Sequence, residues 1–194
     1  WKPEDLKWGL WETIETRTFP GSVSNHHLGT LLGQLMAAYE MNAFKDEYQK
    51  AVVENAKHFA KCLAAEGLDV AGDPAMDYTE THQVIVKVGY AHGPEVADRL
   101  EANNIVCNYQ ATPEEEGFSA SGALRMGVNE MTRFGFGKED FAKLAHLIAD
   151  CVLHHANVKE EVKKLRAEHL EMKYCFSDKD TEELLNAFAS ATGI

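Results

Sequence analysis

The spacing of apolar residues changes at Gly67, and this change limits the folds that the chain can adopt. From Leu28 to Leu63, apolar side chains recur at three- and four-residue intervals, which is the period of one face of an α-helix. Gly67 is a residue type that commonly ends helices, and short β-branched runs such as residues 83–88 follow it. We therefore expect a long helical arm over residues 25–66, with a break near residues 42–46, followed by a small sheet.

The order of the expected elements predicts an α+β fold. Two helices are followed by two strands, a short helix, two more strands and a long amphipathic helix, which is the pattern of a small, mostly antiparallel sheet covered by helices. The expected strands lie at residues 70–72, 83–88, 105–108 and 123–128. We divide the chain into an N-terminal part with the arm, a small α+β domain and a helical C-terminal extension, at residues 1–66, 67–155 and 156–194.

The composition argues against several classes of partner. A formal net charge of −12 disfavours nucleic acid and anionic membrane surfaces. No apolar run approaches the length of a membrane span, and the polar start is unlike a signal peptide. The four cysteines form no CxxC pair, so we expect reduced thiols in a cytoplasmic protein. Because residue 1 is Trp rather than Met, we expect the chain to have been cut or processed at its start.

One arginine, Arg125, stands inside the apolar run at residues 123–128. Burying an unpaired charge is costly, so an arginine in such a strand is expected to meet an anion. Its planar fork suits a carboxylate held by two parallel hydrogen bonds. Arg125 is therefore a candidate carboxylate clamp, and the alternative is a structural salt bridge inside the fold.

No self-contained catalytic set is found in the sequence. There is no HExxH, no zinc spacing of Cys and His, no phosphate loop and no GxSxG elbow, so we expect no metal site. What remains looks like part of a site: Arg125, the polar run at residues 108–110 and the turn at residues 21–27. The chain is thus expected to contribute to a site that other residues complete.

Several segments, taken together, form a recognisable set. They are Phe19–Gly21, Val52–Lys57, Thr81–Val86, Ile105–Asn108, Ser121–Gly137 and Asp140–Ile148. In order and spacing they resemble the C-terminal portion of the serine hydroxymethyltransferase family over residues 17–155. The resemblance implies the small domain of a fold-type-I pyridoxal phosphate enzyme, with residues 1–66 holding the end of its large domain and the linking arm.

The resemblance also implies roles for individual residues. Arg125 falls on the arginine that binds the carboxylate of the substrate, serine or glycine. A second group falls on a turn that approaches the partner subunit's cofactor phosphate in the family's homodimer, and it consists of Gly21, Ser24, Asn25 and His26. Asn108 and Gln110 fall on the folate side of the site, where tetrahydrofolate would be the co-substrate.

The lysine that holds pyridoxal phosphate in this family lies in a Thr-His-Lys context before the Phe-Pro-Gly turn, and no lysine here has that context. We therefore expect no catalytic residue in this chain, a missing large domain upstream, and no activity of these residues alone. In the intact enzyme, serine and glycine would be interconverted by one-carbon transfer to tetrahydrofolate.

Departures from the family pattern keep two alternatives open. Ser24–His26 replace a Gly-Gly-Pro run, Tyr109 and Gln110 replace a Lys-Asn pair, and Val128–Glu130 replace Thr-Pro-Ala. These changes lie mainly where folate and phosphate are handled, so a folate-independent threonine aldolase or transaldolase acting on β-hydroxy amino acids is one alternative. The other is a non-catalytic binding or assembly module that uses the Trp-rich start and the exposed arm as its interface.

Overall fold

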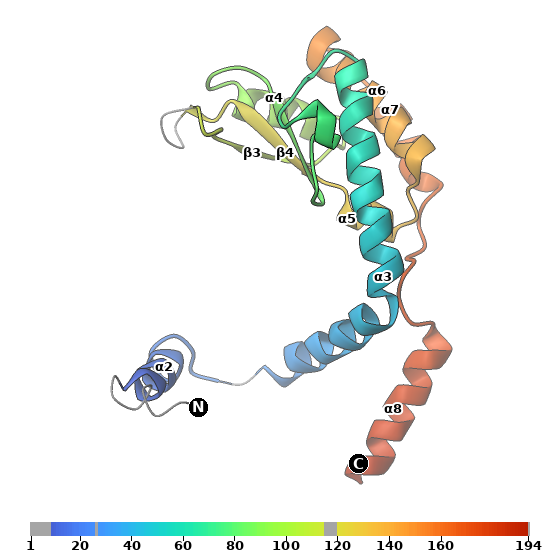
Figure 1. Cartoon of the computed structure of the whole chain (residues 1–194). Coiled ribbons are helices and arrows are strands. Elements are labelled where there is room, and N and C mark those ends of the chain that lie inside the picture. Colours follow the sequence, from blue (N-terminus) through green and yellow to red (C-terminus); the bar gives the residue numbers. More distant parts are fainter. Residues whose placement is uncertain (1–8, 26, 115–119, 194) are drawn as a thin grey trace. The chain divides into compact units, whose positions relative to one another are not determined.

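The computed structural model describes residues 9–25, 27–114 and 120–193 (Figure 1). The chain divides into two compact units, residues 1–42 and 43–194, and each is considered by itself. The elements, in chain order, are α2 (Leu10–Thr18), α3 (Leu28–Ala65), β1 (Asp69–Val70), a 3-10 turn (Pro74–Met76), β2 (Gln83–Lys87), α4 (Gly93–Ala102), β3 (Asn108–Gln110), β4 (Ala123–Gly127), α5 (Asn129–Arg133), α6 (Lys138–His154), α7 (Lys159–Ala167) and α8 (Asp178–Thr192).

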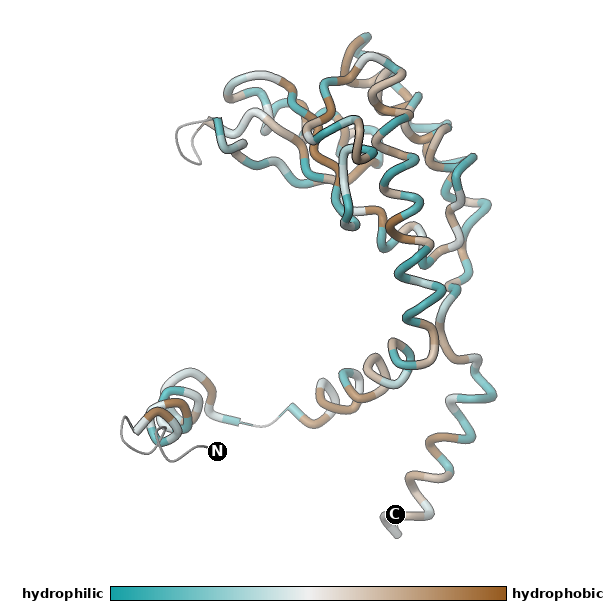
Figure 2. Tube along the Cα trace, viewed as in Figure 1, coloured by the Kyte–Doolittle hydropathy of each residue, from teal (hydrophilic) through white to brown (hydrophobic). Residues whose placement is uncertain are grey.

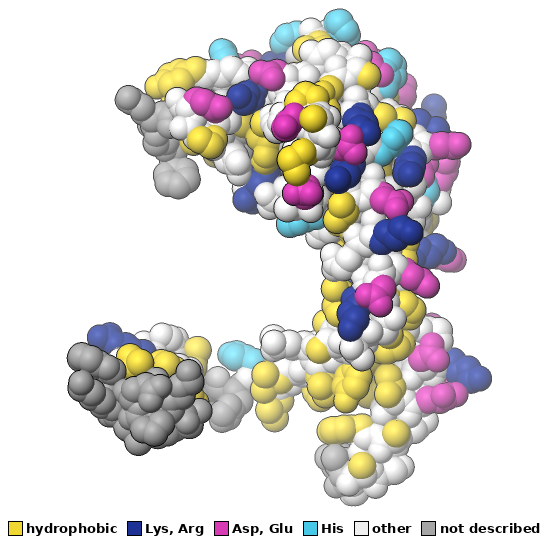
Figure 3. Space-filling model, in the orientation of Figure 1, with side chains coloured by type: hydrophobic (Ala, Val, Ile, Leu, Met, Phe, Trp, Pro, Cys, Tyr) yellow, Lys and Arg dark blue, Asp and Glu magenta, His cyan; other side chains and the backbone are white. Residues whose placement is uncertain are grey.

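The first unit is helical and exposes apolar side chains. It holds α2 and the first part of α3, and α2 has no buried residue. The exposed apolar residues of this part of α3 include Leu28, Leu31, Leu32, Leu35 and Tyr39. Figure 3 shows hydrophobic side chains on the surface of this part of the helix. The expected break near residues 42–46 is wrong, because α3 runs as one helix from Leu28 to Ala65. Residues 42–46 contain neither Gly nor Pro, so nothing in them ends a helix.

The second unit contains the predicted α+β fold. Its four strands form one antiparallel sheet in the order β1-β2-β4-β3, and helices lie on one side of it (Figure 1). The expected small antiparallel sheet covered by helices is therefore confirmed. The domain boundaries expected at residues 66 and 155 stay predictions.

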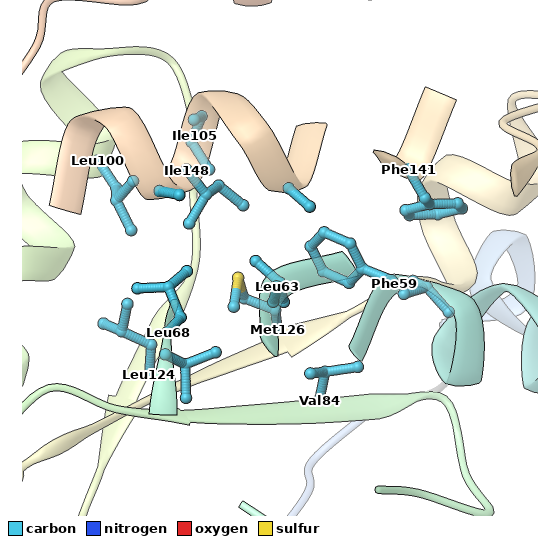
Figure 4. Close-up of a cluster of buried hydrophobic side chains, with 14 of the residues drawn as sticks. Phe59, Leu63, Leu68, Val84, Leu100, Ile105, Leu124, Met126, Phe141 and Ile148 are labelled. Atoms are coloured by element: carbon cyan, nitrogen blue, oxygen red, sulfur yellow. The ribbon is translucent and has the colours of Figure 1, made fainter. Parts of the chain in front are cut away.

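The core lies between the sheet and the helices. Alternate residues of β2 and β4 face it, since Val84 pairs with Met126 and Val86 pairs with Leu124. Across from them pack side chains of α3, α4 and α6, which include Phe59, Leu63, Leu100, Phe141 and Ile148 (Figure 4). The hydropathy colouring follows this arrangement, with apolar stretches on the inner strands and on the helix faces (Figure 2).

The third strand begins later than the sequence indicates. The expected strand at residues 105–108 is wrong, because β3 covers Asn108–Gln110. Asn104 adopts a left-handed φ of 64°, and the Ile105 amide donates to the Leu100 carbonyl oxygen at 2.9 Å. Residues 104–105 therefore close the end of α4 instead of pairing in the sheet.

Within the second unit, the start of the C-terminal extension packs back on α3 and on the end of α5. The Lys173 amide donates to the Arg133 carbonyl oxygen at 2.6 Å, and the rings of Tyr174 and Tyr48 lie 5.3 Å apart. α8 then starts with a capping box in which Ser177 accepts from the Asp180 amide. Within the part of the chain that the structure describes, no helix is long and apolar enough to cross a membrane.

Candidate functional site

Arg125 lies in the middle of β4, on the sheet face opposite the core. Its neighbours Leu124 and Met126 point into the core, so alternation directs Arg125 to the other face. Ile85 of β2 and Asn108 of β3 are its register partners. The pairing therefore brings Asn108 and Arg125 side by side across the sheet, although the sequence separates them by a loop.

The guanidinium of Arg125 is half-buried and has no carboxylate partner among residues 9–25, 27–114 and 120–193. Arg99, in contrast, is paired with Glu95 at 2.8 Å. The alternative of a structural salt bridge to Arg125 is thus not met by any residue that the structure describes. A half-buried guanidinium that meets no carboxylate among the described residues favours binding of an anion from outside the chain.

A cavity of about 810 Å³ opens beside Arg125 at the edge of the sheet. β3 pairs with β4 at residues 123–125, so no strand of the described residues pairs with Met126–Gly127 on that side of β4. Polar side chains line one part of the cavity, namely His82, Gln83, Asn108, Asn129 and Arg125. The volume is in the range that small-molecule sites usually have.

α5 forms a wall of the cavity and is braced from behind. Tyr48 of α3 donates from its hydroxyl to the Asn129 carbonyl oxygen at 3.0 Å, and burial raises the pKa of the Tyr48 phenol. Gly127 leads into α5 so closely that a Cβ there would lie 2.8 Å from Asn129 Oδ1. A side chain at residue 127 would therefore push the Asn129 side-chain amide away from its present position.

The two residues expected on the folate side have different positions. Asn108 is exposed and lines the cavity next to Arg125. Gln110 lies opposite Ala123, one pair further along the same sheet face, and does not line the cavity. The structure thus brings Asn108 to Arg125 and leaves Gln110 beyond the cavity wall.

The expected phosphate-side residues lie in the first unit, whereas Arg125 lies in the second. Gly21, Ser24 and Asn25 are exposed in the turn between α2 and α3, and His26 lies outside the described residues. The turn is tight, because a Cβ on Gly21 would lie 2.7 Å from the Arg17 carbonyl oxygen. It ends at the N-terminus of α3, whose first turn carries no acidic residue.

Among the cavity-lining residues that sequence reasoning did not assign to the site are Glu130, His82 and Arg166. Glu130 and His82 flank the ends of β4 and β2, so the position of polar residues next to a strand end was a usable signal. Arg166 comes from α7, and no local pattern links it to β4. Its place in the cavity follows only from the packing of the C-terminal extension.

The thiols and histidines do not add a metal centre. Among the described residues, no group of three His, Cys, Asp or Glu side chains could hold a metal ion. Cys107 lines the cavity, and burial raises the pKa of its thiol to about 11. The Cys107 thiol is therefore protonated near neutral pH and is a poor nucleophile or metal ligand.

Comparison with known proteins gives a consistent result. The family model described as serine hydroxymethyltransferase matches residues 2–148. The serine hydroxymethyltransferase of Sulfolobus acidocaldarius is 37% identical over 177 residues, covering 88% of this chain and 41% of that protein. The serine hydroxymethyltransferase of Methanopyrus kandleri is 38% identical over 174 residues, covering 86% of this chain and 40% of that protein.

A solved structure is also similar. The crystal structure of L-threonine transaldolase from Pseudomonas fluorescens matches with a TM-score of 0.76 and 30% identity, over 89% of this chain and 40% of that one. The chain therefore spans about 40% of the length of the relatives that it matches.

Proposed function

Since the chain belongs to the serine hydroxymethyltransferase family, we propose that it forms the substrate-binding C-terminal part of a pyridoxal-phosphate-dependent enzyme that interconverts serine and glycine. The observation that carries this proposal is Arg125, a half-buried guanidinium without a carboxylate partner among the described residues, beside a cavity of about 810 Å³. Such a guanidinium supplies a positive charge and paired N–H donors, which can bind the carboxylate of an amino acid.

Arg125 would hold the substrate carboxylate by two parallel hydrogen bonds. A carboxylate fixed at two points can rotate little, so the bonds at the α-carbon acquire a defined direction. Asn108, the register neighbour of Arg125, offers an amide to a second polar group of the substrate or co-substrate. The role of these residues is orientation, and the bond cleavage itself depends on the cofactor.

The turn before α3 has features that suit the cofactor phosphate. A helix N-terminus favours anions, and the first turn of α3 has no acidic side chain that would repel one. Ser24 and Asn25 are exposed next to it and offer a hydroxyl and an amide. When bound, pyridoxal phosphate supplies an electron sink for cleavage of a bond at the substrate's α-carbon. We propose that its lysine lies in a part of the protein outside these 194 residues.

The test is the affinity of the full-length protein for glycine and serine, measured by isothermal titration calorimetry. Arg125→Ala is expected to raise the dissociation constant about 10- to 100-fold, because a charge-assisted hydrogen-bonding pair is lost. Arg125→Lys keeps the charge but not the fork, so an intermediate loss is expected. The matched control is Lys163→Ala on the exposed face of α7, which should bind glycine like the wild type. Unchanged affinity in Arg125→Ala would overturn the proposal.

A transaldolase acting on β-hydroxy amino acids is the second candidate. It is favoured by the similarity to the L-threonine transaldolase structure and by Tyr109 and Gln110, which depart from the family's folate-side residues. Serine cleavage that requires tetrahydrofolate supports the hydroxymethyltransferase. Exchange of the side chain of threonine for that of an added aldehyde, indifferent to tetrahydrofolate, supports the transaldolase.

A further inference from the structure

The short helix α5 follows directly on the strand that carries Arg125. A single residue, Val128, joins Gly127 at the end of β4 to Asn129 at the start of α5, and it is 1% exposed. The Thr132 amide of α5 donates to the Val128 carbonyl oxygen at 2.9 Å. A displacement of α5 is therefore transmitted to β4 through a buried connection of one residue.

The sheet holds the end of β4 less firmly than its middle. β3 pairs with β4 at residues 123–125, so Arg125 is the last residue of β4 that pairs with described strands on both sides. Beyond it, β4 pairs with β2 as far as Gly127, and the Val128 amide donates to the His82 carbonyl oxygen at 3.0 Å. A contact that fixes α5 therefore restrains the part of β4 that β3 does not reach.

Two contacts from outside the sheet hold α5 at its two ends. At the first residue, the Tyr48 hydroxyl of α3 donates to the Asn129 carbonyl oxygen at 3.0 Å. At the last residue, the Lys173 amide donates to the Arg133 carbonyl oxygen at 2.6 Å, and it belongs to residues 173–176, which we call the C-terminal strap. A helix of five residues is marginal on its own in water, so the position of α5 depends on contacts of this kind.

Aromatic rings of the strap pack against α3 beside the first of these contacts. The ring centroid of Tyr174 lies 5.3 Å from that of Tyr48. Phe176 and Phe44, which lies one helical turn before Tyr48, form a second pair at 5.7 Å. All four rings are half-buried. The strap, which lies beyond residues 2–148 that the family model matches, thus packs on α3 where Tyr48 reaches α5.

We infer that Tyr48 is a positioning residue for the substrate carboxylate, because its hydroxyl fixes α5 and thereby the end of the strand that presents Arg125. The strap contributes through Tyr174, whose ring packs against Tyr48 and keeps the Tyr48 hydroxyl directed at α5. The inference rests on the proposed role of Arg125 and extends it to residues outside that strand. Such positioning acts on affinity, since a guanidinium on a strand that is free to move loses more conformational freedom when it binds a carboxylate.

The experiment measures the affinity of the full-length protein for glycine by isothermal titration calorimetry, beside urea unfolding of each variant. Tyr48→Phe keeps the ring and removes the hydroxyl. It is expected to raise the dissociation constant for glycine about 3- to 10-fold, the size of effect that one hydrogen bond has. The matched control is Tyr90→Phe, which removes the hydroxyl of an exposed tyrosine before α4 and should bind glycine like the wild type.

Two variants at Tyr174 separate positioning from stability. Tyr174→Ala removes the ring beside Tyr48, so it should also weaken glycine binding, by up to about the same 10-fold. Tyr174→Phe keeps the ring and should recover most of the affinity that Tyr174→Ala loses. Because Tyr174 acts through the Tyr48 hydroxyl, Tyr174→Ala should weaken binding little further in protein that already carries Tyr48→Phe. A merely structural role would lower the stability of the variants and leave the affinity of the folded protein unchanged.

The inference is overturned if either Tyr48→Phe or Tyr174→Ala binds glycine like the wild type, whatever its stability in urea. It is also overturned if Tyr174→Phe binds as weakly as Tyr174→Ala, because the ring would then not be what holds Tyr48. If Tyr48→Phe does not fold, the two Tyr174 variants decide in the same way. In each of these cases, glycine binding that is still weakened in Arg125→Ala leaves the proposed function standing, whereas unchanged binding in Arg125→Ala overturns the proposed function itself.

Discussion

Asn55 joins α3 to the segment that carries the cavity wall, and its removal should destabilise the second unit. Its side-chain amide donates to Thr132 Oγ1 and to the Phe136 carbonyl oxygen, both at 3.0 Å. All three residues are buried, with exposed fractions of 6% for Asn55, 1% for Thr132 and 5% for Phe136. Water therefore cannot replace the amide without rearrangement of the core.

The magnitude for Asn55→Ala follows from the acceptors that it leaves behind. A buried polar group without a partner costs about 1–3 kcal/mol. The Thr132 hydroxyl can rotate toward another partner, so its cost lies at the low end of this range. The Phe136 carbonyl oxygen is fixed, so its cost is higher. We therefore expect a loss of about 2–4 kcal/mol in the free energy of unfolding. Thr132→Val removes one of the two acceptors, so the pair should couple by about 0.5–1.5 kcal/mol in a double-mutant cycle.

The assay is urea unfolding of the wild type, Asn55→Ala, Thr132→Val and the double variant, followed by circular dichroism. The midpoint and the slope give the free energy of unfolding for each. Asn186→Ala on the exposed surface of α8 is the control and should stay within about 0.5 kcal/mol of the wild type. A loss below about 1 kcal/mol in Asn55→Ala would refute the reasoning, because the buried acceptors would then not need this donor.

Two further predictions concern titratable groups of the second unit. His146 lies 3.2 Å from Glu66 and 3.6 Å from Asp150, and the hydrogen bond to Glu66 together with both negative charges raises the pKa of His146. The contribution of protonated His146 to stability is thus fully present below the ordinary histidine pKa of about 6.5, and it is lost as the pH rises through the raised pKa of the folded protein. Because His146 and its acidic partners are exposed, this contribution should amount to about 0.2–1 kcal/mol. Urea unfolding of His146→Gln should show less of this pH dependence, and an unchanged profile would contradict it. Burial raises the pKa of the Cys107 thiol to about 11, so iodoacetamide at pH 8 should modify Cys107 much more slowly than Cys175, as followed by peptide mass spectrometry. Equal rates for the two thiols would contradict that assignment.

Elements whose signals are local were predictable from the sequence. The helix expected over residues 141–153 is α6, which covers Lys138–His154, because its apolar period and its acidic first turn are both written in neighbouring residues. The alternating run at residues 83–88 is β2 for the same reason. The position of β3 was not predictable from β-branched residues alone, since it depends on how the chain leaves α4.

The candidate site was predictable only in part. An arginine inside an apolar strand identified Arg125, but its closeness to Asn108 depends on the register of β3 against β4, which no local pattern encodes. The place of Arg166 depends on its contact with Phe134, which comes from a distant part of the sequence, and on its hydrogen bond to His169. The position of Asn108 next to Arg125 and the position of Arg166 are thus both decided by long-range packing rather than by residue type.

The measurement that tests the central claim most directly is a crystal structure of the full-length protein with bound glycine. The account predicts both carboxylate oxygens of glycine within about 2.7–2.9 Å of the Arg125 guanidinium nitrogens, with Asn108 beside them. A glycine carboxylate held elsewhere, with Arg125 paired to an Asp or Glu of the protein, would contradict the account and make this arginine a structural salt bridge.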